Sequence, residues 1–275
     1  MVSLAPEEIV RRAAAAFNAG RREEARRLCE QGLSVDPGEP MLSHLLAAVF
    51  AASGELETAR THVEASLARR PDNAAARLLA ARLARTAGDF EAALSHLDHA
   101  IALSPQRDAF VEKARTLDQA GLRPQARQAW RAILDVIPDH AEAAARAGRL
   151  AWEDGDAALA VKLLEQAVLQ DAPPSVWFDL ALARQDLRDY AGAAAAYRKA
   201  IDLKADHVEA IFNLGVVLQE TGDPEGAMRA YGQAYRLRSE SFGRIAMALT
   251  SGSHGRLWLD EAALRRALED QGLLK

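Results

Sequence analysis

The sequence has little of several residue types whose scarcity limits what the protein can do. Of its 275 residues, one is cysteine (Cys29) and only 5% are aromatic. A single cysteine forms no internal disulfide, so nothing in the composition demands an oxidising compartment. We expect Cys29 to be a small buried hydrophobic residue, because it lies at a helix position that packs inward. Lysine is also scarce beside arginine, which we interpret first as composition bias.

Long hydrophobic runs are missing as well. No stretch approaches the apolar length of a membrane span, so we expect no membrane insertion. Residues 1–20 lack the apolar segment of an export signal, and charged residues interrupt any such run. We therefore expect a cytoplasmic protein, and the Ala/Arg-rich composition suggests a bacterial one. The net charge of −5 argues against a nucleic-acid partner, since phosphate binding needs clustered positive charge.

What the chain does have is a periodic series of small residues. Seven alanines recur at steps of 34, 34, 33, 34, 33 and 34 residues: Ala25, Ala59, Ala93, Ala126, Ala160, Ala193 and Ala227. A second series runs twelve positions ahead of them: Ala13, Ala47, Ala81, Ala114, Gly148, Ala181 and Gly215. Such a period indicates an array of one supersecondary unit, because each copy buries its apolar face against its neighbours. Two helices of a unit approach closely only where both side chains are small.

Turn signals divide each period. A glycine five residues before most of the seven alanines ends one helix, and in the sixth period Arg188 replaces it. Prolines follow seventeen residues after four of these glycines and close the unit. Asp139 with Glu142, and Asp206 with Glu209, have the spacing of a capping box. Pro173 and Pro174 predict a distorted link after the fifth period.

Small residues, glycine, alanine, an aromatic residue and proline at these offsets resemble the tetratricopeptide repeat (TPR) family. The aromatic position of the second helix holds Trp130, Tyr197 and Tyr231. The resemblance implies an all-α fold: a right-handed α-solenoid of seven antiparallel helix pairs with a helical C-terminal cap. Residues 1–239 would form the seven-repeat array, and residues 240–275 a degenerate eighth repeat or capping segment.

The segment after residue 239 has two interpretations. It is either a divergent eighth repeat that covers the last apolar face, with Trp258 packed inward, or a docking element that presents Leu257 and Trp258 to a partner. We expect one helix from Ser239 to Thr250 and another, capped by Asp260, that runs through about Asp270.

The sequence offers no convincing catalytic or metal-binding set. It contains no glycine-rich phosphate loop, no GxSxG and no HExxH. His62 and His96 share one repeat position, and His99 lies one turn from His96, but their spacing matches no standard ligand pattern. We therefore predict a non-enzymatic protein with no catalytic residue, metal or cofactor.

The TPR resemblance implies that the first helix of each repeat lines a binding surface. Arginine occupies the ninth position in repeats three to five, and Asn213 occupies the sixth position of repeat seven, where some relatives hold a ligand backbone. The predicted peptide-binding residues are Phe17, Met41, Arg82, Arg85, Arg115, Arg149, Trp152, Phe178, Phe212 and Asn213.

Arginines at one repeat position repel one another unless something offsets their charge. One interpretation is internal pairing, of Arg115 with Asp118 and of Arg149 with Glu153. The other is a docking strip for an acidic or carboxylate-bearing segment, because arginine contacts carboxylates in a bidentate manner. The two interpretations are compatible.

We therefore predict a scaffold or adaptor that holds a protein or peptide segment, with an acidic group against the arginines. The alternatives are a self-assembling structural protein, in which the cap or the first helix packs on another copy, and a non-catalytic subunit of a transferase or of a secretion or assembly complex. No residue in the sequence identifies the partner.

Overall fold

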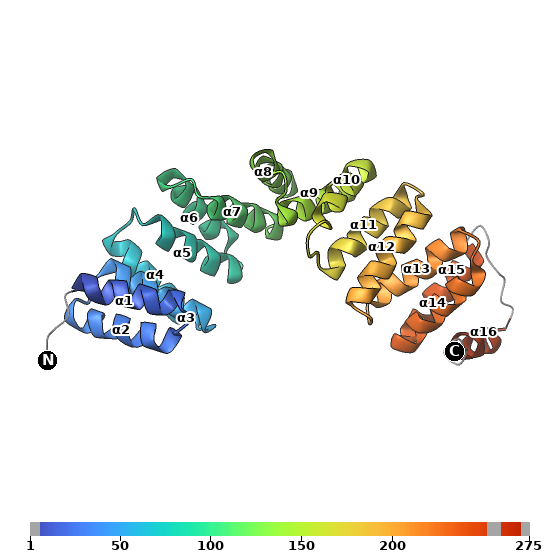
Figure 1. The fold of residues 1–275 in the computed structure, drawn as a ribbon, viewed down its shortest axis with the longest axis horizontal. Coiled ribbons are helices and arrows are strands. Elements are labelled where there is room, and N and C mark those ends of the chain that lie inside the picture. Colours follow the sequence, from blue (N-terminus) through green and yellow to red (C-terminus); the bar gives the residue numbers. More distant parts are fainter. Residues whose placement is uncertain (1–5, 252–259, 271–275) are drawn as a thin grey trace. The chain divides into compact units, whose positions relative to one another are not determined.

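Each repeat folds as two antiparallel helices, in agreement with the sequence pattern (Figure 1). The computed structural model describes residues 6–251 and 260–270, and the regular structure of these residues is entirely helical. The seven pairs are α1 (Pro6–Asn18) with α2 (Arg22–Val35), α3 (Pro40–Ala52) with α4 (Leu56–Arg69), α5 (Ala74–Thr86) with α6 (Phe90–Leu103), α7 (Arg107–Gln119) with α8 (Arg123–Val136), α9 (Ala141–Glu153) with α10 (Ala157–Ala167), α11 (Pro174–Asp186) with α12 (Tyr190–Leu203), and α13 (Val208–Glu220) with α14 (Pro224–Leu237).

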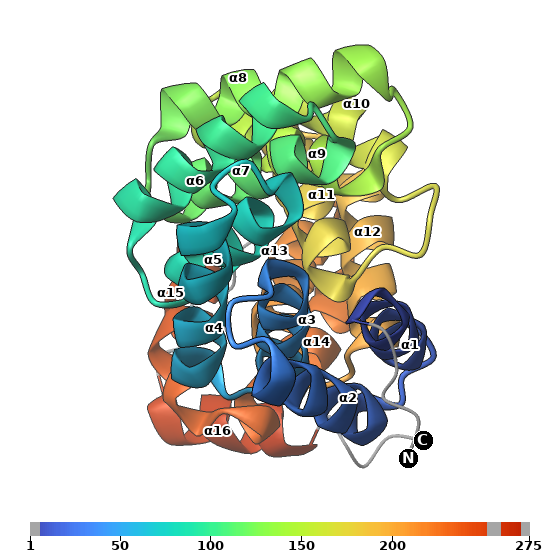
Figure 2. The ribbon, with the colours of Figure 1, turned by 90° about the vertical axis from the view of Figure 1, so that its left-hand side faces the viewer.

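The chain divides into an N-terminal unit, residues 1–129, and a C-terminal unit, residues 130–275, with the division inside α8. In the N-terminal unit, the second helix of each pair packs against the first helix of the next, as α4 does on α5 and α6 on α7 (Figure 2). The same order holds in the C-terminal unit, where α10 packs on α11 and α12 on α13. Each unit is therefore a stack of helix pairs.

The predicted turns have the backbone geometry that their residues permit. Six of the seven turns within the pairs contain a glycine with φ between +71° and +85°. In the sixth pair Arg188 takes this place with φ of +60°, a left-handed conformation that disfavours a residue with a Cβ atom. Arg188 thus fulfils the turn role that its position predicts.

Helix starts are capped by short polar side chains, but not always by the expected ones. Before the second helices, carboxylates such as Asp89 and Asp156 accept the N–H of the third helical residue at 3.0 Å. The capping-box prediction for Asp139 and Asp206 is wrong by one residue. His140 and His207 are the caps, and their Nδ1 atoms accept from the third residues of α9 and α13 at 3.2 and 3.4 Å. The helices begin one residue later than the box requires, so the aspartates lie in the link.

The core follows the small-residue register. All seven alanines of the first series are at most 1% exposed. A Cβ atom added to Gly215 would lie 2.6 Å from the Tyr231 ring, and one added to Gly148 would lie 2.8 Å from the Leu164 side chain. Trp130, Tyr197 and Tyr231 at the aromatic position are fully buried. The pairs therefore pack at a distance that only hydrogen or methyl side chains allow.

The link after the fifth repeat is distorted, as Pro173 and Pro174 predict. Helix α10 has 11 residues, whereas the second helices of the other six pairs have 14. A proline disfavours helical geometry in the residue before it, and Pro173, which precedes Pro174, is extended with ψ of 160°. Residues 168–173 therefore connect the two repeats as a longer non-helical link.

The chain continues past α14 through a short 3₁₀ turn, η1 (Ser239–Ser241), into α15 (Phe242–Ser251), and later forms α16 (Glu261–Asp270). Asp260 caps α16 as expected, since its carboxylate accepts the N–H groups of Ala262 and Ala263. Four apolar residues of these helices join the core around Tyr231: Ile245, Leu249, Leu264 and Leu268. Trp258 and Leu257, on which the cap and docking interpretations differ, lie outside the described residues.

We predict that Gly215→Ala lowers the free energy of unfolding by about 1–3 kcal/mol, because the added methyl group collides with the buried Tyr231 ring. Gly243→Ala is the matched control. Gly243 lies at an exposed position of α15, where an added Cβ atom would meet nothing within 4 Å, so alanine there should stabilise the protein by about 0.5–1 kcal/mol. Urea denaturation followed by circular dichroism measures both, and equal stability of the two variants would refute the packing argument.

Candidate functional site

The predicted binding residues lie on the first helices of the repeats, in both units. The N-terminal unit contains Phe17, Met41, Arg82, Arg85 and Arg115, and the C-terminal unit contains Arg149, Trp152, Phe178, Phe212 and Asn213.

In the N-terminal unit, three arginines converge on one buried carboxylate. Glu112 on α7 is 3% exposed. Its Oε1 accepts from Arg115 Nη1 at 2.7 Å and lies 3.4 Å from Arg82 Nε, and its Oε2 accepts from Arg85 Nε at 3.2 Å. Arg85 also donates to Gln119 Oε1 at 3.0 Å. Glu112 therefore ties α5 to α7 and holds the guanidinium groups together.

The shared carboxylate of Glu112 offsets the repulsion between the three arginines. A buried carboxylate is costly unless it is paired and hydrogen-bonded, and here three cations satisfy it. The arginine side chains differ in exposure: 19% for Arg85, 37% for Arg115 and 43% for Arg82. Arg82 is the most exposed of the three, so it presents the most surface to a ligand.

The two apolar residues predicted on the N-terminal unit are half-buried. Phe17 packs against a small core cluster that includes Ala16, Ala25 and Val49. Met41 lies on α3 and keeps part of its side chain accessible. Both retain some apolar surface for contact.

In the C-terminal unit, Arg149 on α9 also pairs with a buried carboxylate. Its Nη1 donates to both oxygens of Asp179 at 2.9 and 3.2 Å, and its Nε donates to Glu153 at 3.1 Å. The predicted pair of Arg149 with Glu153 is thus confirmed. Burial raises the pKa of Asp179, which is 5% exposed, while Arg149 acts in the opposite direction.

Glu112 and Asp179 were not predicted. Both occupy the sixth position of a first helix, and each pairs with an arginine thirty residues earlier, at the ninth position of the preceding repeat. A search for opposite charges at that separation, rather than within one helix, would have found both.

Trp152 lies beside this pair on the same helix, α9. Its indole Nε1 donates to Asp186 Oδ2 on α11 at 2.7 Å. The ring is half-buried, so one part of it is fixed by the neighbouring repeat and another part is accessible. Trp152 and Asp186 thus link the first helices of repeats five and six.

The remaining predicted residues differ in how much surface they offer. Phe178 is half-buried, with its ring 4.9 Å from His207 and 5.8 Å from Tyr197. Phe212 is only 8% exposed, and the Arg244 guanidinium lies over its ring at 4.3 Å. Asn213 is half-buried on α13, near the Tyr197 hydroxyl, which donates to Gln185 Oε1 at 2.8 Å. Of the two phenylalanines, Phe178 therefore offers accessible surface, whereas Phe212 is mainly a core residue.

His62 and His96, which share one repeat position, each contact a neighbouring side chain. His62 stacks on Phe50 at 5.4 Å, and His96 Nδ1 lies 3.3 Å from Arg77 Nη1. Within residues 6–251 and 260–270, no three His, Cys, Asp or Glu side chains gather as a metal site would require. Cys29 is fully buried, as predicted, and burial raises its pKa to about 12. None of the described helices is long and apolar enough to cross a bilayer.

Comparisons with known proteins identify the family. Tetratricopeptide repeat profiles match residues 16–83, 50–109, 111–176 and 178–241, which together cover more than half of the chain. The chain belongs to the tetratricopeptide repeat family, whose members generally mediate protein–protein interaction and are typically non-catalytic. No curated protein matches the sequence.

Solved structures share the fold at low sequence identity. PilF of Pseudomonas aeruginosa has a TM-score of 0.67 and 17% identity, covering 74% of this chain and 94% of that one. YrrB, described as a TPR protein with an unusual peptide-binding site, has a TM-score of 0.57 and 16% identity, covering 66% and 95%. MamA from Desulfovibrio magneticus has a TM-score of 0.56 and 20% identity, covering 61% and 96%.

We predict that Glu112→Gln lowers the free energy of unfolding by about 1–3 kcal/mol, because three guanidinium groups lose the charge that holds them together. The loss should shrink as salt screens the arginines from one another. Urea titrations at low and high salt measure both effects.

Glu64→Gln is the control for Glu112→Gln. Glu64 pairs with Arg60 on the exposed surface of the same unit, so its loss should change stability by less than about 0.5 kcal/mol. If the two variants are equally stable, the Glu112 cluster does not contribute to the fold.

Proposed function

We propose that this protein is a non-catalytic scaffold that holds a segment of a partner protein on the first-helix faces of its repeats. An acidic group of that segment contacts the guanidinium of Arg82, which Arg85 and Arg115 flank. Apolar side chains of the segment contact the accessible surface of Phe17 and Met41 in the same unit. The family's general role in protein–protein interaction supports this proposal, as does the peptide-binding site named for the similar protein YrrB.

The observation that carries the proposal is the organisation of the Glu112 cluster. Three arginines share one buried carboxylate, and the outermost, Arg82, uses its Nε toward Glu112. Its terminal amino groups suit a bidentate contact with a carboxylate. Because the whole protein carries a net charge of −5, this cationic cluster favours selective contact over general attraction of anions.

We further propose that residues 1–239 form the binding array and residues 240–275 a cap. The burial of Ile245, Leu249, Leu264 and Leu268 in one core cluster with Tyr231 supports the cap.

A cytoplasmic and bacterial setting fits the composition. Self-assembly is the second candidate function, and light scattering over a concentration series would detect it.

Selection of random twelve-residue peptides on the purified protein tests the proposed function. We expect the selected peptides to combine Asp or Glu with apolar residues. A representative peptide should bind Arg82→Gln at least tenfold more weakly in fluorescence anisotropy, since a desolvated charge-assisted contact contributes about 1.5–3 kcal/mol. Its affinity for the wild type should fall as salt rises.

Arg60→Gln is the matched control for this test, because Arg60 is exposed on the second helix of its repeat, α4. It should bind the peptide as the wild type does. Selected peptides without acidic residues, or equal binding to Arg82→Gln and to the wild type, would refute the proposed site.

A further inference from the structure

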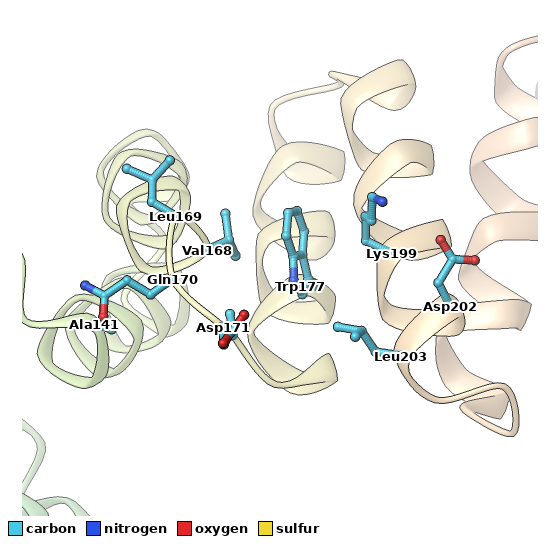
Figure 3. Close-up of a pocket in the computed structure, with 10 residues that line it drawn as sticks. Ala141, Val168, Leu169, Gln170, Asp171, Trp177, Lys199, Asp202 and Leu203 are labelled. Atoms are coloured by element: carbon cyan, nitrogen blue, oxygen red, sulfur yellow. The ribbon is translucent and has the colours of Figure 1, made fainter.

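The early end of α10 creates a pocket at a place that the other repeats fill with helix. Where the second helices of the other repeats complete a last turn, Val168, Leu169 and Gln170 are unwound. The pocket has a volume of about 830 Å³, and link residues, the first residue of α9, and residues of α11 and α12 line it (Figure 3). This size is in the range of ligand-binding pockets in proteins.

One aromatic ring and three charged groups give the pocket its chemistry. Trp177 on α11 is half-buried and stands between the link and α12 (Figure 3). Asp171 lies on the link, and Lys199 and Asp202 lie on α12. Within the described part of the chain, none of these three charged groups has an ion-pair partner, and the Trp177 indole has no hydrogen-bond partner. The pocket is thus lined by solvent-exposed charged groups around a half-buried indole.

The charge balance of the lining favours a cation. Two carboxylates face one ammonium, so the charged lining is net negative, in the same sense as the whole protein. An indole face attracts cations more strongly than the other aromatic rings do, and a carboxylate beside it adds a direct partner. The aliphatic side chains of Val168 and Leu203 offer apolar contact to the stem of a long basic side chain.

We propose that this pocket binds an arginine or lysine side chain of a partner's peptide segment. The cationic group stacks on Trp177 and pairs with Asp171, while Asp202 adds to the negative charge of the lining. A neighbouring apolar residue covers Val168 and Leu203. The site is distinct from the first-helix face. Trp177 is adjacent to Phe178 in sequence, so its side chain points about 100° away from that of Phe178 around α11. Lys199, Asp202 and Leu203 belong to α12, which is a second helix.

Binding of a capped tetrapeptide, acetyl-Gly-Arg-Leu-Gly-amide, to the full chain tests this site. The four tryptophan indole signals of the ¹⁵N-labelled protein report on it, and Trp177→Phe assigns the relevant one. We expect the Trp177 signal to shift saturably by about 10 mM peptide, tenfold above a millimolar dissociation constant. The Trp152 signal should not move, because Trp152 on α9 does not line the pocket.

Two variants test the chemistry, with circular dichroism as the check on folding. Asp171→Asn should weaken binding about threefold or more, as expected for loss of a partly exposed ion pair, whereas Lys199→Ala should strengthen it. Asp186→Asn is the control and should bind as the wild type does. An unmoved Trp177 signal, an equal or larger shift with acetyl-Gly-Glu-Leu-Gly-amide, or unchanged affinity in a folded Asp171→Asn variant would overturn the proposal.

Discussion

The structure depends on one steric constraint: the two helices of each repeat cross where their side chains are a methyl group or a hydrogen. Ala25 and its six equivalents are buried at these crossings, and at Gly215 even a methyl group would meet the Tyr231 ring. Close crossing brings the backbones together and leaves the space beside them for the residue at the aromatic position, which is buried in every repeat. Which side chains face outward from the first helix follows from that register.

Features that a repeat determines locally could be predicted from the sequence. The glycine turns, the role of Arg188, the distorted link at Pro173 and the burial of Cys29 depend on residues close in sequence or on one repeat position. Features that depend on contacts between repeats could not. The Arg149 pair with Glu153 is within one helix, but its pair with Asp179 crosses to the next repeat. Phe212 is covered by an arginine of α15, which no repeat position specifies.

Ion pairs between neighbouring repeats explain why the arginines of the first-helix faces are not simply exposed charges. Each buried carboxylate at the sixth position lowers the cost of placing arginines nearby, and the arginines in turn make burial of the carboxylate tolerable. In the Glu112 cluster this balance fixes three guanidinium groups before any ligand arrives. Binding to such a preorganised cluster requires less ordering of side chains than binding to separate flexible arginines.

The central claim is that Arg82 contacts an acidic group of the partner segment directly. A double-mutant cycle measures this contact, with Arg82→Gln in the protein and Asp→Asn or Glu→Gln at the acidic residue of a selected peptide. Direct contact predicts a coupling free energy of about 1 kcal/mol or more between the two changes. Additivity within about 0.3–0.5 kcal/mol at every acidic position of the peptide would contradict the claim.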